Sequence, residues 1–223
     1  MDLRNTLDFL KNLKKNNNRD WFAEHKTEYQ SHQLEMKGFY EQVKQNLQIH
    51  DEIERLKMFR IYRDVRFSHD KTPYNPHFAG SFSRRGAHLR GGYYLRIRPG
   101  ESFLAGGFWA PNKEDLFRIR KEIEIDDQEL RAILNEPKFV SSFGGELFGD
   151  EVKTAPKGFQ KDHPAIDLIR KKGFVARREF TDREVADSNF QQIIDDSFRG
   201  LRPFFDYMSE VLTTDLNGVS TLE

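Results

Sequence analysis

The chain has 223 residues, with 36 basic and 36 acidic side chains and no cysteine. The absence of cysteine excludes disulfides, thiolate catalysis and cysteine-based zinc or iron–sulfur sites. No apolar run approaches the about 18 residues of a membrane helix, and the first residues lack a secretory pattern, so we expect a cytoplasmic protein that does not enter a membrane.

The N-terminal third has helical periodicity. Apolar positions predict a short helix capped by Thr6, which stops at an asparagine run. Asn18 is the expected cap of a second helical stretch that continues to Leu47. We expect this stretch to break once, near Ser31 or Gly38.

From residue 57 the apolar period changes to two. Residues 59–67 alternate, except for Arg63 on the apolar side, and predict a half-buried strand. Residues 78–83, 93–98 and 102–108 predict three more strands, and Arg98-Pro99-Gly100-Glu101 fits a type II turn. In the strand at 93–98 the alternation places Tyr94, Arg96 and Arg98 on one face. Short connections between consecutive strands favour an antiparallel meander.

Helical patterns return after residue 111. They predict helices from Asn112 or Pro111 to residue 123, and over 126–134 with a capping box. A third should run from Asp162 to Gly173, followed by a strand at 174–180 and a long helix over 188–212, kinked near Pro203. No linker or repeat interrupts the pattern. The sequence therefore predicts a single α+β domain over residues 1–223, with an antiparallel β-meander sheet packed against N-terminal and C-terminal helices.

Phosphate-loop, dinucleotide, serine-hydrolase and zincin motifs are absent. His25, Glu28 and His32 share a helical face, but an exposed polar stripe is the preferred interpretation, and we assign no metal or cofactor. The charge is uneven along the chain. Residues 55–98 hold nine Arg and two Lys against two Asp, together with eight aromatic residues. Such a segment attracts anions.

The segment RDVRFSHDKTPY and the arginine just before it make the first candidate site. Arginine suits two-pronged recognition of phosphate or carboxylate. Asp64 is a candidate catalytic base or metal ligand. The candidate ligand-binding residues are Arg60, Arg66, Asp70, Lys71 and Tyr74. The alternative is an Arg–Asp network that only locks the strand end and the turn.

Two further segments are candidates. In KTAPKGFQKDHP, Lys157 and Lys161 precede a predicted helix start, where an anion is favoured and His163 could act as acid or base. Asp162 as the cap would compete with such an anion. Trp109 either floors a pocket or stacks on a base, or it belongs to the core, which is the commoner role.

Long strings of the sequence resemble the conserved-hypothetical family called domain of unknown function 2461. They include RDVRFSHDKTPY, YYLRIRPGESFLAGGFWAP, KTAPKGFQKDHPAIDLIRKKGF and FRGLRPFFDYM, in this order. The resemblance implies a single-domain protein of mostly bacterial type and implies no activity. His69 and Asn75 stand where members often have lysine, which makes this loop less basic.

Three hypotheses remain open at this stage. The first is a small anionic ligand that the chain binds or acts on, in one basic, aromatic-lined cleft formed by the candidate residues. The second is a nucleic-acid-binding module, although the chain has no net charge. The third is an interaction protein without a small-molecule ligand. The sequence decides neither enzymatic activity nor oligomeric state.

Overall fold

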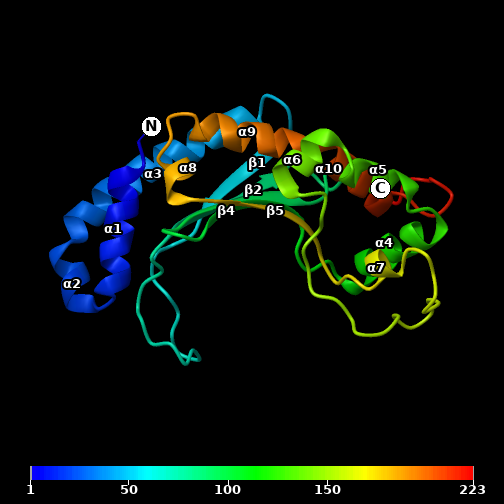
Figure 1. Cartoon of the computed structure of the whole chain (residues 1–223), viewed down its shortest axis with the longest axis horizontal. Helices are drawn as coiled ribbons and strands as arrows, with labels where there is room; N and C mark the ends of the chain where they lie inside the picture. Colours follow the sequence, from blue (N-terminus) through cyan, green and yellow to red (C-terminus); the bar gives the residue numbers. More distant parts are fainter. Residues whose placement is uncertain (1, 223) are drawn as a thin grey trace. The chain divides into compact units, whose positions relative to one another are not determined.

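The computed structural model describes residues 2–222. Five strands form one antiparallel sheet in the order β1-β2-β3-β4-β5, so neighbours in sequence are neighbours in the sheet (Figure 1). The strands are β1 (Ile53–Met58), β2 (Phe78–Arg84), β3 (Gly92–Ile97), β4 (Ser102–Phe108) and β5 (Phe174–Phe180). The predicted α+β class with an antiparallel meander and flanking helices is confirmed.

The helices precede the sheet, interrupt it and follow it. None in the described range is long and apolar enough to cross a membrane. The helices are α1 (Arg4–Lys15), α2 (Arg19–Glu24), α3 (Lys26–Leu47), α4 (Lys113–Ile125), α5 (Gln128–Leu134), α6 (Pro137–Phe143), α7 (Ile166–Ile169), α8 (Asp182–Val185), α9 (Phe190–Gly200) and α10 (Arg202–Thr213).

The chain divides into two compact units, which we describe separately. Unit 1 takes the described residues up to Phe82, Tyr94–Leu104 and Glu179–Asp195. Unit 2 takes Ser83–Tyr93, Ala105–Arg178 and the described residues from Asp196 onward. Strands β2 to β5 contribute residues to both units. The single domain expected from the sequence stays a prediction.

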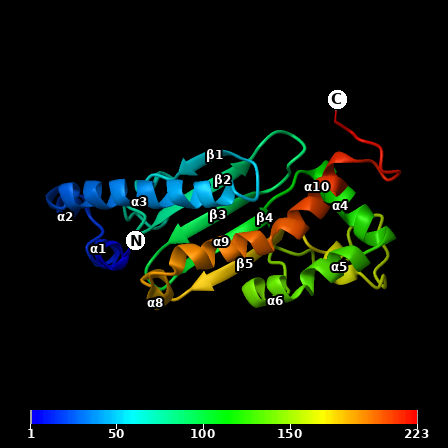
Figure 2. The ribbon, with the colours of Figure 1, turned by 90° about the horizontal axis from the view of Figure 1, so that it is seen from above.

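In unit 1, α3 covers one face of the strands (Figure 2). The Tyr40 hydroxyl donates to the carbonyl oxygens of Phe78 and Leu95, each at 3.1 Å. Gly80 on β2 faces the same ring, and a Cβ added there would lie 2.8 Å from the Tyr40 ring. Glycine at this position therefore lets the helix approach the sheet. The opposite face of β3 carries half-buried side chains instead.

In unit 2, aromatic packing joins β3 and β4 to the C-terminal helices. Tyr93 makes edge contacts with Phe198 of α9 and Phe205 of α10, at ring-centroid distances of 4.9 and 4.8 Å. Phe108 of β4 contacts Phe204 and Phe205 of α10 in the same way. Edge contacts of this kind add to the apolar area buried by each ring. An aromatic-weighted core follows from these contacts.

Local signals predicted several elements correctly. Asn18 caps α2 by accepting from the Trp21 amide at 2.9 Å, and Asn112 caps α4 by accepting from the Asp115 amide at 2.7 Å. The turn before β4 closes through a Glu101 amide to Arg98 carbonyl bond of 2.9 Å, and Gly100 has a φ of 73°. This positive φ is what the type II turn requires at its third position.

Three predicted features are wrong. The strand predicted at residues 59–67 lies instead at Ile53–Met58, and only Tyr62 pairs beyond it, with Tyr74. The N-terminal helical stretch breaks at His25, between α2 and α3, and continues through Ser31 and Gly38. Thr6 lies inside α1, where its hydroxyl contacts the buried His32 ring, and does not cap it.

Further corrections concern the second half of the chain. The helix predicted from Asp162 is reduced to the four residues of α7, and Asp162 caps nothing there. Asp126 bonds the Gln128 amide, but the capping box with Glu129 does not form. The single kinked helix predicted over 188–212 is two helices instead. α9 ends at Gly200, and α10 begins at Arg202 with Pro203 in its first turn.

Candidate ligand-binding face

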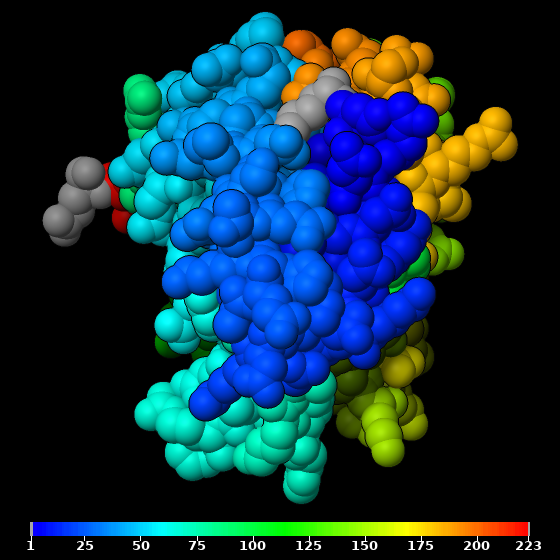
Figure 3. Space-filling model, turned by 90° about the vertical axis from the view of Figure 1, so that its left-hand side faces the viewer, coloured from blue at the N-terminus to red at the C-terminus, as the bar shows by residue number. Residues whose placement is uncertain are grey.

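The β1–β2 loop, residues 59–77, is anchored to the N-terminal helices of unit 1 (Figure 3). Tyr74 is its anchor. Its amide donates to Asn17 Oδ1 at 3.1 Å, and Asn17 Nδ2 donates to the Tyr74 carbonyl at 2.9 Å. The ring also stacks on Phe22 of α2 with centroids 4.0 Å apart. Tyr74, predicted as a ligand-binding residue, is therefore buried and has a structural role.

Within the loop, the charged side chains pair with one another. Arg63 donates to Asp70 at 2.6 Å and to the Thr72 carbonyl at 2.9 Å. Arg66 donates to Asp64 at 2.6 Å. Bonds from the Thr72 backbone and side chain, and then from Arg63, lower the pKa of Asp70. Bonds from Arg66 lower the pKa of Asp64 in the same way. Both carboxylates are therefore held ionised.

The remaining loop cations, Lys71 and Arg60, differ in the contacts that they make. Lys71 donates to the Val65 carbonyl at 3.0 Å and thereby helps to close the loop. Arg60 is exposed and lies near enough to Asp64 to lower the pKa of that carboxyl. The pairing supports the alternative of an Arg–Asp network that locks the loop. It leaves Arg60 and Arg66 at the surface.

The second and third sequence candidates belong to unit 2. Trp109 is 80% exposed, so its expected place in a core is wrong. Lys157 and Lys161 are exposed as well, and His163 Nδ1 accepts from the Ala165 amide at 3.1 Å. The four residues of α7 are too few for the macrodipole on which the predicted anion site depended. A single cleft that includes both these residues and the β1–β2 loop stays a prediction.

The open sheet face of unit 1 carries an aromatic group that sequence reasoning missed. We call Phe59, Tyr94 and Phe103 the ring strip. Phe59 and Tyr94 have centroids 6.1 Å apart, and Tyr94 and Phe103 5.5 Å apart. All three keep part of their surface in contact with solvent. The only available signal was the alternation that placed Tyr94 away from the core.

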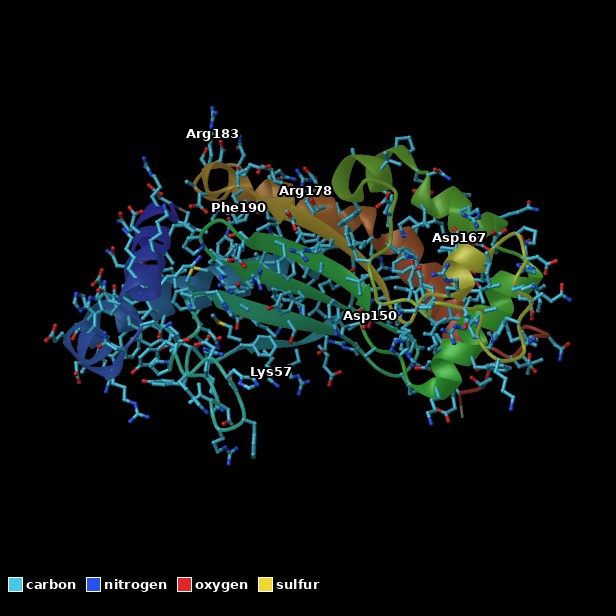
Figure 4. All side chains as sticks on the ribbon, turned by 60° about the horizontal axis from the view of Figure 1, so that its bottom comes forward. Lys57, Asp150, Asp167, Arg178, Arg183 and Phe190 are labelled. Atoms are coloured by element: carbon cyan, nitrogen blue, oxygen red, sulfur yellow. The ribbon has the colours of Figure 1, made fainter. Side chains whose placement is uncertain are left out.

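A cation lies over each end of the ring strip. The Arg96 guanidinium carbon is 4.4 Å from the centroid of Phe103, and Lys57 Nζ is 5.5 Å from that of Phe59. Lys57 is labelled on β1 in Figure 4. Both distances lie within the range of a cation–π interaction. The strip thus combines flat apolar surface with positive charge, although Arg96 also donates to the Glu101 carbonyl at 2.9 Å.

His77 lies where the loop meets β2. Burial, followed by the charges of Arg96 and Arg98 and opposed by Glu101, lowers the pKa of His77 to about 4. Its Nδ1 atom is shielded from solvent and makes no hydrogen bond within the described part of the chain. The ring is therefore neutral at neutral pH, because an imidazolium would be both desolvated and repelled.

Metal-ligating side chains do not gather in residues 2–222: no group of three or more His, Asp or Glu could hold an ion there. The histidines that share a helical face are used otherwise. His25 Nδ1 contacts the Trp21 carbonyl at 2.8 Å, and His32 is buried against Thr6. The expectation that this helical face is an exposed polar stripe is wrong at His32, because that side chain is buried.

These observations define an α+β protein whose antiparallel sheet is flanked by helices and, in unit 1, exposes aromatic and basic side chains on its open face. The model of the family described as Conserved hypothetical protein (DUF2461) matches residues 5–207, and the chain belongs to this family. No curated protein and no solved structure matches the chain.

Proposed function

We propose that the chain binds a small anionic ligand with a flat ring on the open sheet face of unit 1. The observation that carries the proposal is the ring strip, with Arg96 over Phe103 at one end and Lys57 over Phe59 at the other. Half-exposed aromatic rings present a flat apolar surface to a ligand, and the cations beside them attract its charge.

Charge around the strip supports an anionic ligand. Residues 55–82 and 94–98, all in unit 1, contain eight Arg and Lys side chains and only Asp64 and Asp70 with negative charge. A local excess of this size raises the concentration of anions at the surface. Arg60 directly follows Phe59 of the strip. The exposed cations of the β1–β2 loop would therefore join the same binding face.

The carboxylates of the loop take a positioning role in this proposal. Asp70 holds Arg63 and Thr72, and Asp64 holds Arg66. If the chain also catalyses a reaction, the candidate base is Asp64, an exposed carboxylate whose pKa the charge of Arg60 helps to lower. The proposal keeps Trp109, Lys157, Lys161 and His163 as candidate ligand-binding residues of unit 2, with His163 as its acid–base group.

An NMR titration with phenyl phosphate tests this function, because the probe combines a ring with a dianion. We expect amide and ring signals of Phe59, Tyr94 and Phe103 to move, and smaller changes with inorganic phosphate or benzyl alcohol. Phe59→Ala should weaken binding several-fold. The matched control is Phe67→Ala, since Phe67 is 96% exposed in the loop and lies outside the ring strip. Unmoved ring-strip signals at millimolar probe would overturn the proposal.

Single-stranded nucleic acid is the second candidate, and one observation favours it. The three rings lie on different parts of an open sheet face, as in platforms on which successive bases stack. Oligothymidylate should then bind more tightly as its length increases, and binding should weaken steeply with salt. Equal affinity for thymidine monophosphate and for a ten-residue oligomer would leave the small ligand as the function.

A further inference from the structure

The outer edge of β1 is a second open surface of unit 1. β1 is the first strand in the order β1-β2-β3-β4-β5, so it has a neighbouring strand on one side only, and Figure 2 shows it at the rim of the sheet next to β2. No isolated bridge in residues 2–222 involves it either. At its first residue, Gln48 Nε2 donates to the Ile53 carbonyl at 3.1 Å. The edge beyond that residue is open to another strand.

The direction of the backbone groups along β1 follows from the bond at its end. The Phe59 amide, directly after the strand, donates to the Ala79 carbonyl of β2 at 2.9 Å. Backbone groups alternate in direction along a strand, so those of Arg55 and Lys57 also point toward β2. We call the residues whose N–H and C=O groups point outward the edge residues: Glu54, Leu56 and Met58. Such a row of outward groups is a template for a further strand.

Two cations lie on one side of this edge. Arg55 and Lys57 are exposed, and neither makes an ion pair with an acid in the described part of the chain. Lys57 Nζ lies 5.5 Å from the centroid of the Phe59 ring, which places this row of side chains on the open sheet face. An added strand would bring its own side chains on that face next to both cations.

The other side of the edge is apolar. Leu56 and Met58 are half-buried. A Cβ added at Gly80 would lie 2.8 Å from the Tyr40 ring and 3.3 Å from Leu56 Cδ1, so Leu56 points to the side covered by α3. A strand laid along the edge would cover the exposed part of both apolar side chains. This burial favours apolar residues at every second position of such a strand.

The charges of β1 disfavour a second copy of the chain as this strand. In a two-fold antiparallel pairing, edge residues face edge residues, so the pairing is centred on a residue and not between two. The registers that pair nearly the whole strand are centred on Arg55 or on Leu56. The first sets Arg55 opposite its own copy, and the second sets Arg55 opposite Lys57 of the other copy, twice. Like charges directly opposite each other are destabilising.

We propose that the edge of β1 binds an extended acidic peptide segment of another protein as an additional antiparallel strand. Acidic side chains would lie beside Arg55 and Lys57, and apolar ones would alternate with them beside Leu56. Backbone bonds give affinity in this mode of recognition, and the side chains on alternate positions give specificity. The inference goes beyond the proposed function, because the peptide uses the backbone of the sheet edge and the ligand uses the rings of the sheet face.

A synthetic peptide, acetyl-TVEVEVT-amide, tests the edge directly. With its central valine opposite Leu56, its two glutamates fall opposite Arg55 and Lys57. Amide exchange of the full chain is followed by NMR. In the free protein we expect fast exchange at the edge residues and slow exchange at Arg55 and Lys57, and the peptide should protect the edge residues at about millimolar concentration. Edge amides that are already protected in the free chain, or that stay unprotected with the peptide, overturn the inference.

Peptide variants test the charge and the backbone bonds. Acetyl-TVQVQVT-amide should bind several-fold more weakly, and acetyl-TVKVKVT-amide should give no protection. Acetyl-TVEPEVT-amide should also lose binding, because proline lacks the N–H that would donate to the Leu56 carbonyl. Equal protection by the acidic and the basic peptide overturns the proposed partner. So does protection of the edge residues that rises with protein concentration alone, because a second copy is then the occupant.

Protein variants complete the test. Arg55→Gln should weaken binding of acetyl-TVEVEVT-amide several-fold. Arg55→Glu combined with Lys57→Glu should reverse the preference, so that the lysine peptide binds and the glutamate peptide does not. The matched control is Lys37→Glu, which reverses an exposed charge of α3 and should keep the preference of the wild type. Unchanged affinity in Arg55→Gln, or a charge-reversed edge that still prefers the acidic peptide, overturns the inference.

Discussion

Two segments of the chain have nearly the same sequence pattern and different structures. Residues 59–67 and residues 93–98 both alternate aromatic or aliphatic side chains with arginines. The second is β3, whose Leu95 and Ile97 are fully buried. The first is an irregular loop that ends with Phe67 almost completely exposed. Alternation alone therefore does not make a strand; a covering layer on one side is also needed.

The arginines of the two segments differ in the same way. In the loop, Arg63 and Arg66 each find a carboxylate within the segment, at 2.6 Å. At the end of β3, Arg96 and Arg98 lie near the single carboxylate of Glu101, together with Lys14. Arg63 and Arg66 thus each pair with an acid of their own loop, whereas Arg96 and Arg98 lie near one carboxylate that Lys14 also approaches. In our proposal Arg96 of β3, which lies over Phe103 of the ring strip, contributes more to anion binding than the paired arginines of the loop.

The largest expected effect tests the packing of β3 beneath α3. Leu95→Ala should lower the free energy of unfolding by about 2–5 kcal/mol, because it leaves a cavity under α3. Phe67→Ala in the loop should change it by less than about 0.5 kcal/mol. Urea denaturation of both variants measures the contrast. Equal losses would show that the loop contributes to the core as much as the strand does.

The next effect is the loss of folding stability at low pH that is due to His77. Its pKa is about 4 when folded and about 6.5 when unfolded. A lowered histidine pKa means that the unfolded chain binds the proton first, so stability is undiminished above pH 6.5 and falls as the pH drops toward 4. The loss from this group should reach about 2 kcal/mol at pH 5. His77→Gln should remove that part of the acid destabilisation.

Urea denaturation at pH 7 and pH 5 measures this contribution. His69→Gln serves as the control, since His69 is an exposed residue of the loop. Arg98→Gln should restore part of the stability at pH 5, but less than His77→Gln, because burial is the largest cause of the lowered pKa and Arg96 also contributes. A pH dependence identical in wild type and His77→Gln would contradict the buried, repelled imidazole.

The smallest effect tests the two Arg–Asp pairs of the β1–β2 loop. Arg63→Ala removes bonds to Asp70 and to the Thr72 carbonyl, and should cost about 1 kcal/mol. Amide exchange at Thr72 and Tyr74 should become faster, because the loop loses its internal support. Arg66→Ala should leave both stability and exchange unchanged, since its pair with Asp64 is exposed. Faster exchange in Arg66→Ala would mean that the surface pair also orders the loop.

Features decided by neighbouring residues were predictable from the sequence. The Asn18 and Asn112 caps, the turn at Pro99-Gly100 and the two faces of β3 each depend on contacts within a few positions. Side-chain alternation and capping bonds are nearly independent of the rest of the fold. The same reasoning failed for residues 59–67, where Ile61 is buried but Phe59 and Phe67 on the same side stay exposed.

The ring strip, the surroundings of Glu101 and the neutral His77 were decided by tertiary structure. Phe59, Tyr94 and Phe103 come from separate parts of the sequence and meet only because of the register of the sheet. Lys14 reaches Glu101 from α1, and burial together with the charges of Arg96 and Arg98 keeps His77 neutral. The sequence by itself determined most of the elements, the family and the local excess of basic residues. Only packing across strands could decide which of those charges share a surface, since Coulomb energies depend on distance and burial and not on order along the chain.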